Sequence, residues 1–296
     1  MCMKIVFYFF QSICILLITL PFALLPGRFV MWTGQLLGKA GFLFWKSRRN
    51  VAIDGIQKTI DAECLPPTLS PHETAKQSFV HLAQSFLELI KVYLTGGKRI
   101  IESISIAGSE HLYEALDNKK GVIIITGHYG NWELLALAFS QKVSKAHAVA
   151  RRQNNPFLNF FIDKIRRRFG NSIIYKDGAL KKIISVLRSN GIVGILYDQC
   201  VVKDEGVLAE FLCRKAWTMK IPVLLSQKTG APLLPVFIRR SPAGGHMIMI
   251  DKPFYPVKET GIGENLRKMN GFIEKHIIGD PSQWLWIHRR WKRTDS

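Results

Sequence analysis

The chain has 296 residues, enough for one large domain, and 48% of them are hydrophobic, which is ample for a buried core. It carries 41 Lys+Arg against 22 Asp+Glu, a formal net charge of +19. This charge predicts a polyanionic partner: nucleic acid, an anionic membrane surface, a phosphorylated substrate or an acidic protein. The five cysteines are scattered and contain no Cys-x-x-Cys pair. This argues against a disulfide framework or a zinc site and indicates a reducing compartment.

The N-terminus predicts contact with a membrane. Residues 5–25 form an apolar run interrupted only by Gln11, Ser12, Thr19 and Pro21. As a helix this run would be about 30 Å long, the thickness of a hydrocarbon core. A cleaved signal peptide is the alternative, but no small-x-small cleavage site follows the run.

Cations are denser after this run than before it, so the positive-inside rule places the following domain on the cytoplasmic side. Alternatively, the proline could kink the run into a helix that lies in the membrane interface. We expect a membrane anchor over residues 1–27 and a catalytic domain over residues 28–296.

The remaining elements predict an α/β fold with a largely parallel sheet. Residues 31–60 have a helical, basic pattern, and Ser70-Pro71 marks the start of a further helix. Candidate strands then alternate with helices. They are Ile104–Ile106, Val122–Thr126, His147–Ala150, Ile173–Tyr175, Ile192–Tyr197, Leu233–Ile238 and Met247–Ile250.

Residues 126–134 read TGHYGNWEL and place His128 and Glu133 directly after a buried apolar strand. Two glycines permit a tight turn, and Glu133 begins a helical pattern. A carboxylate in the first turn of that helix can face the histidine, fix its tautomer and make it a general base. The alternative is a structural, hydrogen-bonded histidine. Site residues of open α/β folds gather at the carboxyl ends of strands, where this loop would lie.

Two further segments carry candidate residues. Asn155-Pro156 starts an amphipathic helix that ends in a cation cluster containing Arg166 and Arg168. This helix suits a lipid with phosphate head groups, or it is a core helix with a solvated basic face. Asp198 ends a buried strand at the same edge of the sheet. It is interpreted either as a site residue or as a helix-capping or turn residue.

The C-terminal segment 281–293 interleaves Trp284, Trp286 and Trp291 with four cations. This pattern is typical of a membrane interface, with rings at head-group depth and cations on phosphates. It also suits single-stranded nucleic acid. No nucleic-acid-binding module accompanies it, so we expect no nucleic-acid partner.

Taken together, these segments resemble the lipid A biosynthesis acyltransferases, the late-acting lauroyl and myristoyl transferases. The matching blocks are TGHYGNWELL (126–135), ARRQNNP (150–156), RRRFG (166–170), LYDQ (196–199), TGAPLLPVF (229–237) and PSQWLWIHRRWK (281–292). The chain departs from the family at 150–152, where a tyrosine-arginine-proline triplet is usual. It also departs at 213–217, near the place where the family's acyl pocket is expected.

The resemblance implies a glycerolipid-acyltransferase-like fold and transfer of a fatty acyl chain from acyl carrier protein. The acceptor would be a hydroxyl of a 3-hydroxyacyl chain on an anionic lipid A precursor. His128 would be the base and Glu133 its orienting carboxylate, and an arginine or the backbone N–H groups at the start of the Glu133 helix would meet the oxyanion. Substrate binding would fall to Arg151, Asn155, Arg166, Arg168 and Asp198. The chemistry needs no metal or other cofactor.

The implied location is the bacterial inner membrane, with the catalytic domain on its cytoplasmic face. Two alternatives remain open. One is an acyltransferase of the same fold that acts on another glycolipid or a carrier-bound acceptor. The other is a non-catalytic, basic, membrane-associated binding protein, for which replacing His128 would have no effect.

Overall fold

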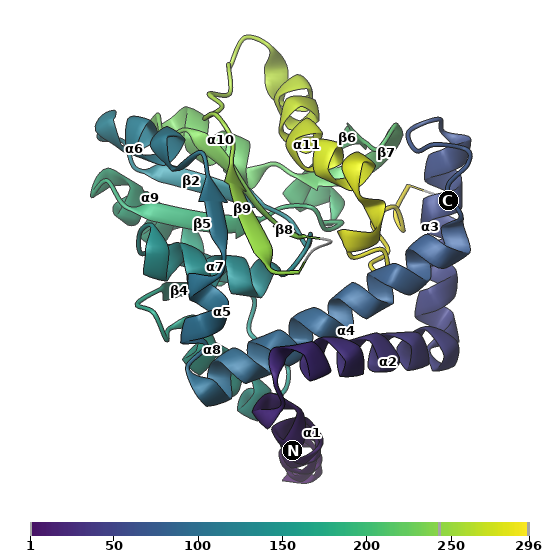
Figure 1. Cartoon of the computed structure of the whole chain (residues 1–296). Coiled ribbons are helices and arrows are strands. Elements are labelled where there is room, and N and C mark those ends of the chain that lie inside the picture. The colour runs from purple at the N-terminus through teal and green to yellow at the C-terminus, as the bar shows by residue number, and fades with distance from the viewer. Residues whose placement is uncertain (1, 242–243, 295–296) are drawn as a thin grey trace.

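The computed structural model describes residues 2–241 and 244–294. Its main strands are β1 (Ser105–Ala107), β2 (Val122–Thr126), β3 (His147–Ala150), β4 (Ser172–Tyr175), β5 (Ile192–Leu196), β8 (Leu233–Arg240) and β9 (His246–Ile250). They form a seven-stranded sheet in the order β1-β9-β8-β2-β5-β3-β4 (Figure 1). Neighbouring strands are parallel except for β8 and β9, which are antiparallel. The predicted α/β fold is confirmed, and each expected strand is present within two residues of its expected bounds.

Helices cover both faces of this sheet. They are α4 (Pro71–Thr95), α5 (Lys98–Glu102), α6 (Ser109–Asp117), α7 (Trp132–Lys142), α8 (Pro156–Arg166), α9 (Ala179–Arg188), α10 (Ile221–Thr229) and α11 (Gly261–Gly279). In β2, Ile123 and Ile125 join a core with α9, α10 and α11, whereas Val122 and Ile124 join a second core with α4, α6 and α7. Because side chains alternate along a strand, the continuous apolar run of β2 serves both cores.

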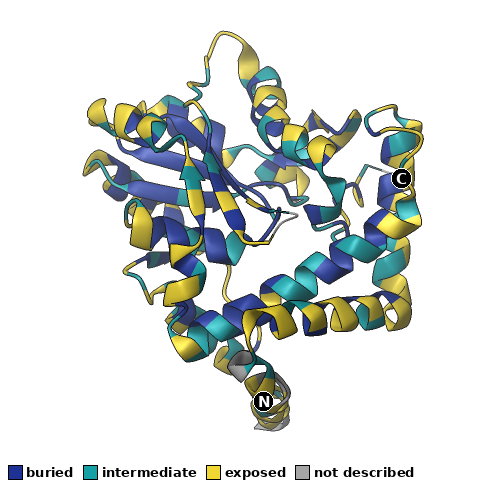
Figure 2. Ribbon diagram, in the orientation of Figure 1, coloured by how far each residue is buried: buried dark blue, intermediate teal, exposed yellow. Residues whose placement is uncertain are grey.

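An N-terminal arm precedes α4 and consists of α1 (Cys2–Leu24), α2 (Gly27–Phe44) and α3 (Lys46–Asp61). Helix α2 lies along α4, and much of its outer face is exposed (Figures 1 and 2). Helix α4 begins where predicted, because Ser70 caps it by accepting a hydrogen bond from the backbone N–H of Glu73 (3.3 Å).

The N-terminal apolar run is helical, as predicted, and α1 includes Pro21. Among the described residues, however, no helix has both the length and the apolarity that crossing a bilayer requires. The transmembrane helix expected from the sequence is thus not found.

A hairpin of two strands lies outside the main sheet and was not predicted. It consists of β6 (Gly206–Phe211) and β7 (Arg214–Met219), which pair antiparallel beside α11. Leu212 and Cys213 form its turn with positive φ angles of 49° and 58°. Turns of this kind usually contain Gly or Asn, so the sequence carries no signal for the hairpin. Two short 3₁₀ helices, η1 (Lys203–Glu205) and η2 (Pro281–Gln283), complete the described elements.

Candidate active site

The loop between β2 and α7 carries His128 at the carboxyl edge of the sheet. Two glycines let this loop approach its neighbours closely. A Cβ atom on Gly130, whose φ is +58°, would lie 2.1 Å from the carbonyl oxygen of Ile238. A Cβ atom on Gly127 would lie 3.1 Å from Cγ of Asp198. The tight turn predicted from the two glycines is therefore confirmed, and each is needed for close packing.

His128 is paired with Asp198, which follows the neighbouring strand β5. Nδ1 of His128 lies 2.7 Å from Oδ1 of Asp198, and the backbone N–H of His128 donates to Oδ2 over 2.9 Å. The indole N–H of Trp284 donates to the same Oδ2 (2.8 Å). The parallel register of β2 and β5 pairs Thr126 with Leu196, so the two chain ends leave the sheet side by side.

The charge state of Asp198 fixes the tautomer of His128. Burial alone would raise the pKa of this carboxyl, but the charge and hydrogen bonds of His128, with the hydrogen bond from Trp284, outweigh burial and lower the pKa to about 2. An ionised carboxylate only accepts hydrogen bonds, so Nδ1 of His128 must carry a proton. Nε2 then carries the lone pair, which accepts a hydrogen bond from the side-chain amide of Gln199 (3.2 Å). A neutral imidazole oriented in this way can take a proton from a hydroxyl.

The expected contact between Glu133 and His128 is not formed. Glu133 lies in the first turn of α7, and its carboxylate binds the guanidinium of Arg166 on α8 at both oxygens, with Nε 2.9 Å from Oε2. Burial would lower the pKa of Arg166, but the charge of Glu133 outweighs it and raises the pKa. The orienting carboxylate of His128 is therefore Asp198, which the sequence analysis had assigned to substrate binding.

The residues predicted to bind substrate lie in different environments. Arg151 and Arg168 are exposed, and Arg168 donates to the backbone carbonyl of Tyr93 (2.9 Å). Arg166 is held by its ion pair. Asn155 is buried, caps α8 and binds α1, and Asp198 is buried behind His128. Both side chains make contacts within the fold, and a substrate-binding role for them stays a prediction.

A cavity of about 830 Å³ lies beside the site. Its walls come from α1, α4, the start of α7, and α8, and they are apolar except for Ser12, Ser85, Asn131 and Glu133. The cavity adjoins the dyad through Trp132, because this side chain lines the cavity and its ring lies 4.9 Å from the imidazole of His128. Its volume and lining are typical of a site for an apolar ligand. Residues 213–217 do not line it, so the departure from the family pattern at those positions lies elsewhere.

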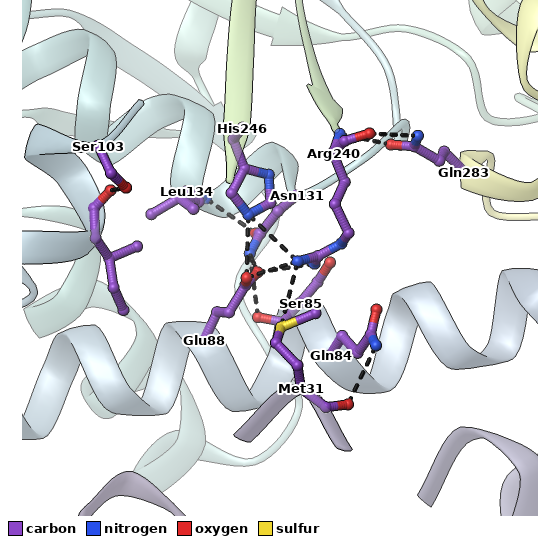
Figure 3. Close-up of polar contacts among 11 residues, drawn as sticks. Met31, Gln84, Ser85, Glu88, Ser103, Asn131, Leu134, Arg240, His246 and Gln283 are labelled. Carbon is purple, nitrogen blue, oxygen red and sulfur yellow. Dashed lines mark hydrogen bonds and ion pairs between the residues drawn. The ribbon is translucent and has the colours of Figure 1, made fainter. Parts of the chain in front are cut away.

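A buried ionic cluster supports the loop from behind (Figure 3). Glu88 of α4 accepts from Nη1 and Nη2 of Arg240 (2.6 and 2.8 Å), lies 3.0 Å from Nε2 of His246, and accepts from Nδ2 of Asn131 (2.8 Å). Burial would raise the pKa of Glu88, but the hydrogen bonds and charges of His246 and Arg240 lower it to about 2. Oδ1 of Asn131 caps α7 by accepting from the backbone N–H of Leu134 (3.1 Å). The cluster therefore ties α4 to the start of α7.

The other side of the loop is tied to the same arginine. The backbone N–H of Arg240 donates to the side chain of Gln283 (2.8 Å), and the backbone carbonyl of Gln283 accepts from Gly130 (3.0 Å). The backbone carbonyl of His128 accepts from Leu285 (3.1 Å). The loop is thus held on both sides before any substrate binds.

The C-terminal tryptophans do not lie at a surface, so the predicted interfacial signature is wrong. Trp284, Trp286 and Trp291 are 2%, 1% and 5% exposed and pack on one another and on Phe211. Arg290 is fully buried among them and donates to the carbonyl of Trp217 and to the hydroxyl of Thr218. Its guanidinium also lies over the ring of Phe211, with Cζ 4.6 Å from the ring centroid. The segment forms the wall that holds Asp198.

The sequence does not point to the supporting residues Glu88, Arg240, His246, Gln199 and Gln283. Glu88 lies among apolar residues of a predicted helix, and Arg240 follows an apolar strand. A single charged residue in such a position is the sequence feature that could have indicated a buried ion pair. No cluster of three or more metal-ligating side chains was found in the described part of the chain.

An imidazole held by a buried carboxylate beside a cavity suited to hydrocarbon is compatible with acyl transfer. Comparison with known proteins shows that the chain is an acyltransferase. The chain belongs to the bacterial lipid A biosynthesis acyltransferase family, whose model matches residues 3–293. The resemblance read from the sequence motifs is thereby confirmed.

Several characterised relatives cover most of the chain at low identity. It is 24% identical over 273 residues to the lipid A biosynthesis lauroyltransferase of Escherichia coli (strain K12), and the aligned region covers 90% of this chain and 87% of that protein. It is 25% identical over 277 residues to the palmitoleoyltransferase of the same strain, with 90% and 86% covered. A phosphatidylinositol mannoside acyltransferase of Mycolicibacterium smegmatis (strain ATCC 700084 / mc(2)155) is 22% identical over 233 residues, with 76% and 75% covered.

Proposed function

We propose that the chain transfers a fatty acyl group from acyl carrier protein to a hydroxyl of a 3-hydroxyacyl chain on a lipid A precursor. The observation that carries this proposal is the pairing of His128 with the buried Asp198, next to the apolar cavity. Family membership supports acyl transfer in lipid A biosynthesis. The acyl carrier protein and the particular acceptor hydroxyl are our own assignments.

In the proposed reaction, Nε2 of His128 takes the proton from the acceptor hydroxyl. The hydroxyl oxygen attacks the thioester carbonyl and forms a new C–O bond. The tetrahedral intermediate then collapses, the C–S bond breaks, and the imidazolium returns its proton to the departing thiolate. Asp198 stabilises the imidazolium between these two steps without taking up the proton itself.

The developing oxyanion requires hydrogen-bond donors that are in place before the reaction. The candidates are the guanidinium of Arg166, which Glu133 holds, and the N–H groups at the start of α7. In this proposal Glu133 positions Arg166 and does not orient His128. The ion pair also accounts for the charged residues beside an otherwise apolar cavity.

The cavity would hold the acyl chain, since its walls are mainly apolar and it adjoins the dyad at Trp132. The net charge of +19, which includes the exposed Arg151 and Arg168, complements a phosphorylated lipid and the acidic carrier protein.

The protein would meet the bacterial inner membrane through its N-terminal arm, with the catalytic domain on the cytoplasmic face. Large apolar side chains are exposed along α1 and α2 and continue into α8, and large exposed patches of this kind mark membrane or protein contacts. Those of α1 and α2 include Ile5, Val6, Phe7, Phe10, Leu17, Leu20, Phe29, Trp32, Leu36, Leu37, Leu43 and Phe44. We propose residues 1–27 as an anchor that inserts into the interface.

The test is the mass spectrum of lipid A from cells that lack the gene and are complemented with wild type, His128→Ala or Glu133→Ala. We expect one secondary acyl chain to be missing without the gene and to return only with wild type. Its mass gives the length of the transferred chain. Unchanged lipid A in all strains would reject the lipid A acceptor.

A second acceptor class has specific support, because the mycobacterial relative is named for transfer to a phosphatidylinositol mannoside. If lipid A is unchanged, the total lipid extract of the same strains would reveal another acylated glycolipid. A non-catalytic binding protein would instead complement equally well with wild type and with His128→Ala.

A further inference from the structure

We infer that α1 forms a wall of the acyl cavity and, through Phe9 and Ile13, helps to set the length of the acyl chain that the enzyme accepts. The inference rests on the proposed function, because it assigns the cavity to the acyl chain. It gives the N-terminal helix a role in substrate selection that is separate from membrane attachment.

The first observation is the face of α1 that meets the cavity. Phe9, Ser12 and Ile13 all line it, and their spacing of i, i+3 and i+4 places them on one side of the helix. Phe9 also packs edge-on against Phe157 of α8, with ring centroids 5.4 Å apart. Phe9 and Phe10 are 46% and 59% exposed, but only Phe9 belongs to the lining.

The second observation is a polar contact that fixes α1 in this position. Nδ2 of Asn155 lies within hydrogen-bond distance of three acceptors on α1: the carbonyl of Tyr8 (3.1 Å), Oε1 of Gln11 (3.0 Å) and Oγ of Ser12 (3.1 Å). Oδ1 of the same side chain caps α8 by accepting from Phe157 and Leu158. Because Asn155 is buried, breaking this contact leaves its side-chain N–H groups without partners, whereas Ser12 keeps its hydrogen bond to the carbonyl of Tyr8 (2.8 Å).

This contact explains two features of the sequence. Gln11 and Ser12 are adjacent polar residues in the apolar run 5–25, and a helix that only entered lipid would have no need of them. Asn155 was predicted to bind substrate, but its amide holds together the two helices that line the cavity. Gln11 and Ser12 of α1 therefore contact the same side chain, Asn155, that caps α8.

The volume available to hydrocarbon then depends on the size of the α1 side chains. One methylene gained or lost in an apolar pocket changes selectivity by about tenfold or more. We expect Phe9→Ala, which enlarges the cavity, to shift the preferred donor toward longer chains. Ile13→Trp fills the cavity and should shift the preference toward shorter chains.

The experiment offers the full-length enzyme an equimolar mixture of saturated acyl donors, decanoyl to palmitoyl, on acyl carrier protein, and measures the products by mass spectrometry. The product ratio of long to short chains should rise about tenfold in Phe9→Ala and fall about tenfold in Ile13→Trp. Phe10→Ala is the matched control and should keep the wild-type ratio. Wild-type ratios in both wall variants would overturn the inference while leaving acyl transfer intact.

A second variant tests the docking contact. Asn155→Ser retains a side chain that caps α8 but cannot reach α1. We expect it to keep its helical content and lose chain-length selection, whereas an unchanged product ratio would count against the inference. Binding of the corresponding fatty acids to each full-length variant, measured without acceptor, gives a readout that needs no turnover. Length-selective binding by a wild type that transfers no acyl group would reject the proposed function and retain the role of α1.

Discussion

Nδ1 of His128 lies 2.7 Å from Oδ1 of Asp198, although 70 residues separate the two in the chain. The strands that carry them, β2 and β5, are neighbours in the sheet, and both residues follow the carboxyl ends of those strands. The carboxylate also accepts hydrogen bonds from the backbone of His128 and from the indole of Trp284, which leave it one orientation. The imidazole is thus held in one orientation, with Nδ1 on Asp198 and Nε2 beside the side-chain amide of Gln199.

Asp198→Asn should reduce the catalytic rate by about 10²–10⁴-fold, because an amide no longer enforces the reactive tautomer or stabilises the imidazolium. Steady-state kinetics with purified enzyme measures the loss. His128→Ala should cause a loss of similar size, and the double variant should be no worse than either single variant, since the two residues act as a unit. If the rate loss of the double variant equals the product of the two single losses, the two residues act independently and the dyad is contradicted.

The ion pair between Glu133 and Arg166 should appear in a double-mutant cycle. Their carboxylate and guanidinium are only 20% and 19% exposed, so removing one partner leaves the other poorly solvated beside an apolar cavity. We expect Glu133→Ala and Arg166→Ala each to lower activity, with a coupling of about 0.5–3 kcal/mol in the double variant. Additive effects of the two substitutions would mean that they act separately.

The buried cluster around Glu88 should stabilise the fold only as a complete set. Glu88→Ala leaves the charge of Arg240 buried without its carboxylate, and losing one partner of such a pair costs about 3–5 kcal/mol. Urea unfolding measures this loss. The paired replacement Glu88→Leu with Arg240→Met should recover much of the stability, because neither charge then remains. A double variant as unstable as Glu88→Ala would contradict this account.

The stability of the protein should depend on pH through His81. Burial lowers the pKa of this imidazole from its ordinary 6.5 to about 4, with a further contribution from the charge of Arg240. Because the folded pKa is the lower one, the unfolded chain binds more protons below pH 6.5. The stability associated with neutral His81 is therefore complete above pH 6.5 and is lost progressively as the pH falls toward 4.

His81→Gln should flatten this dependence, because glutamine does not titrate. The free energy of unfolding, measured in urea at several pH values between 6.5 and 4, should fall less steeply for the variant than for wild type. His288, whose pKa burial also lowers to about 4, continues to contribute a slope in both proteins. Parallel curves for the two proteins would contradict the assignment to His81.

The local elements of the site can be predicted from short stretches of sequence. The apolar run 122–126 is buried on both sheet faces, Gly127 and Gly130 are needed for the turn, and the helix begins at Trp132. These features depend on residues adjacent in the chain, which is why periodicity and turn residues locate the strands and His128. The family motifs are likewise short and contiguous.

The groups that meet at that loop are brought together by the order of the strands and the packing of the helices. Sequence spacing favoured Glu133 as the partner of His128 because it is five residues away, but strand order brought Asp198 to the histidine and α8 brought Arg166 to Glu133. The C-terminal segment has the composition of a membrane-interface segment, but its tryptophans lie in the core. They are buried there because residues 283–285 pair with the backbone of the loop that carries His128. Long-range pairing follows from the packing of whole elements, and no local pattern in the chain records it.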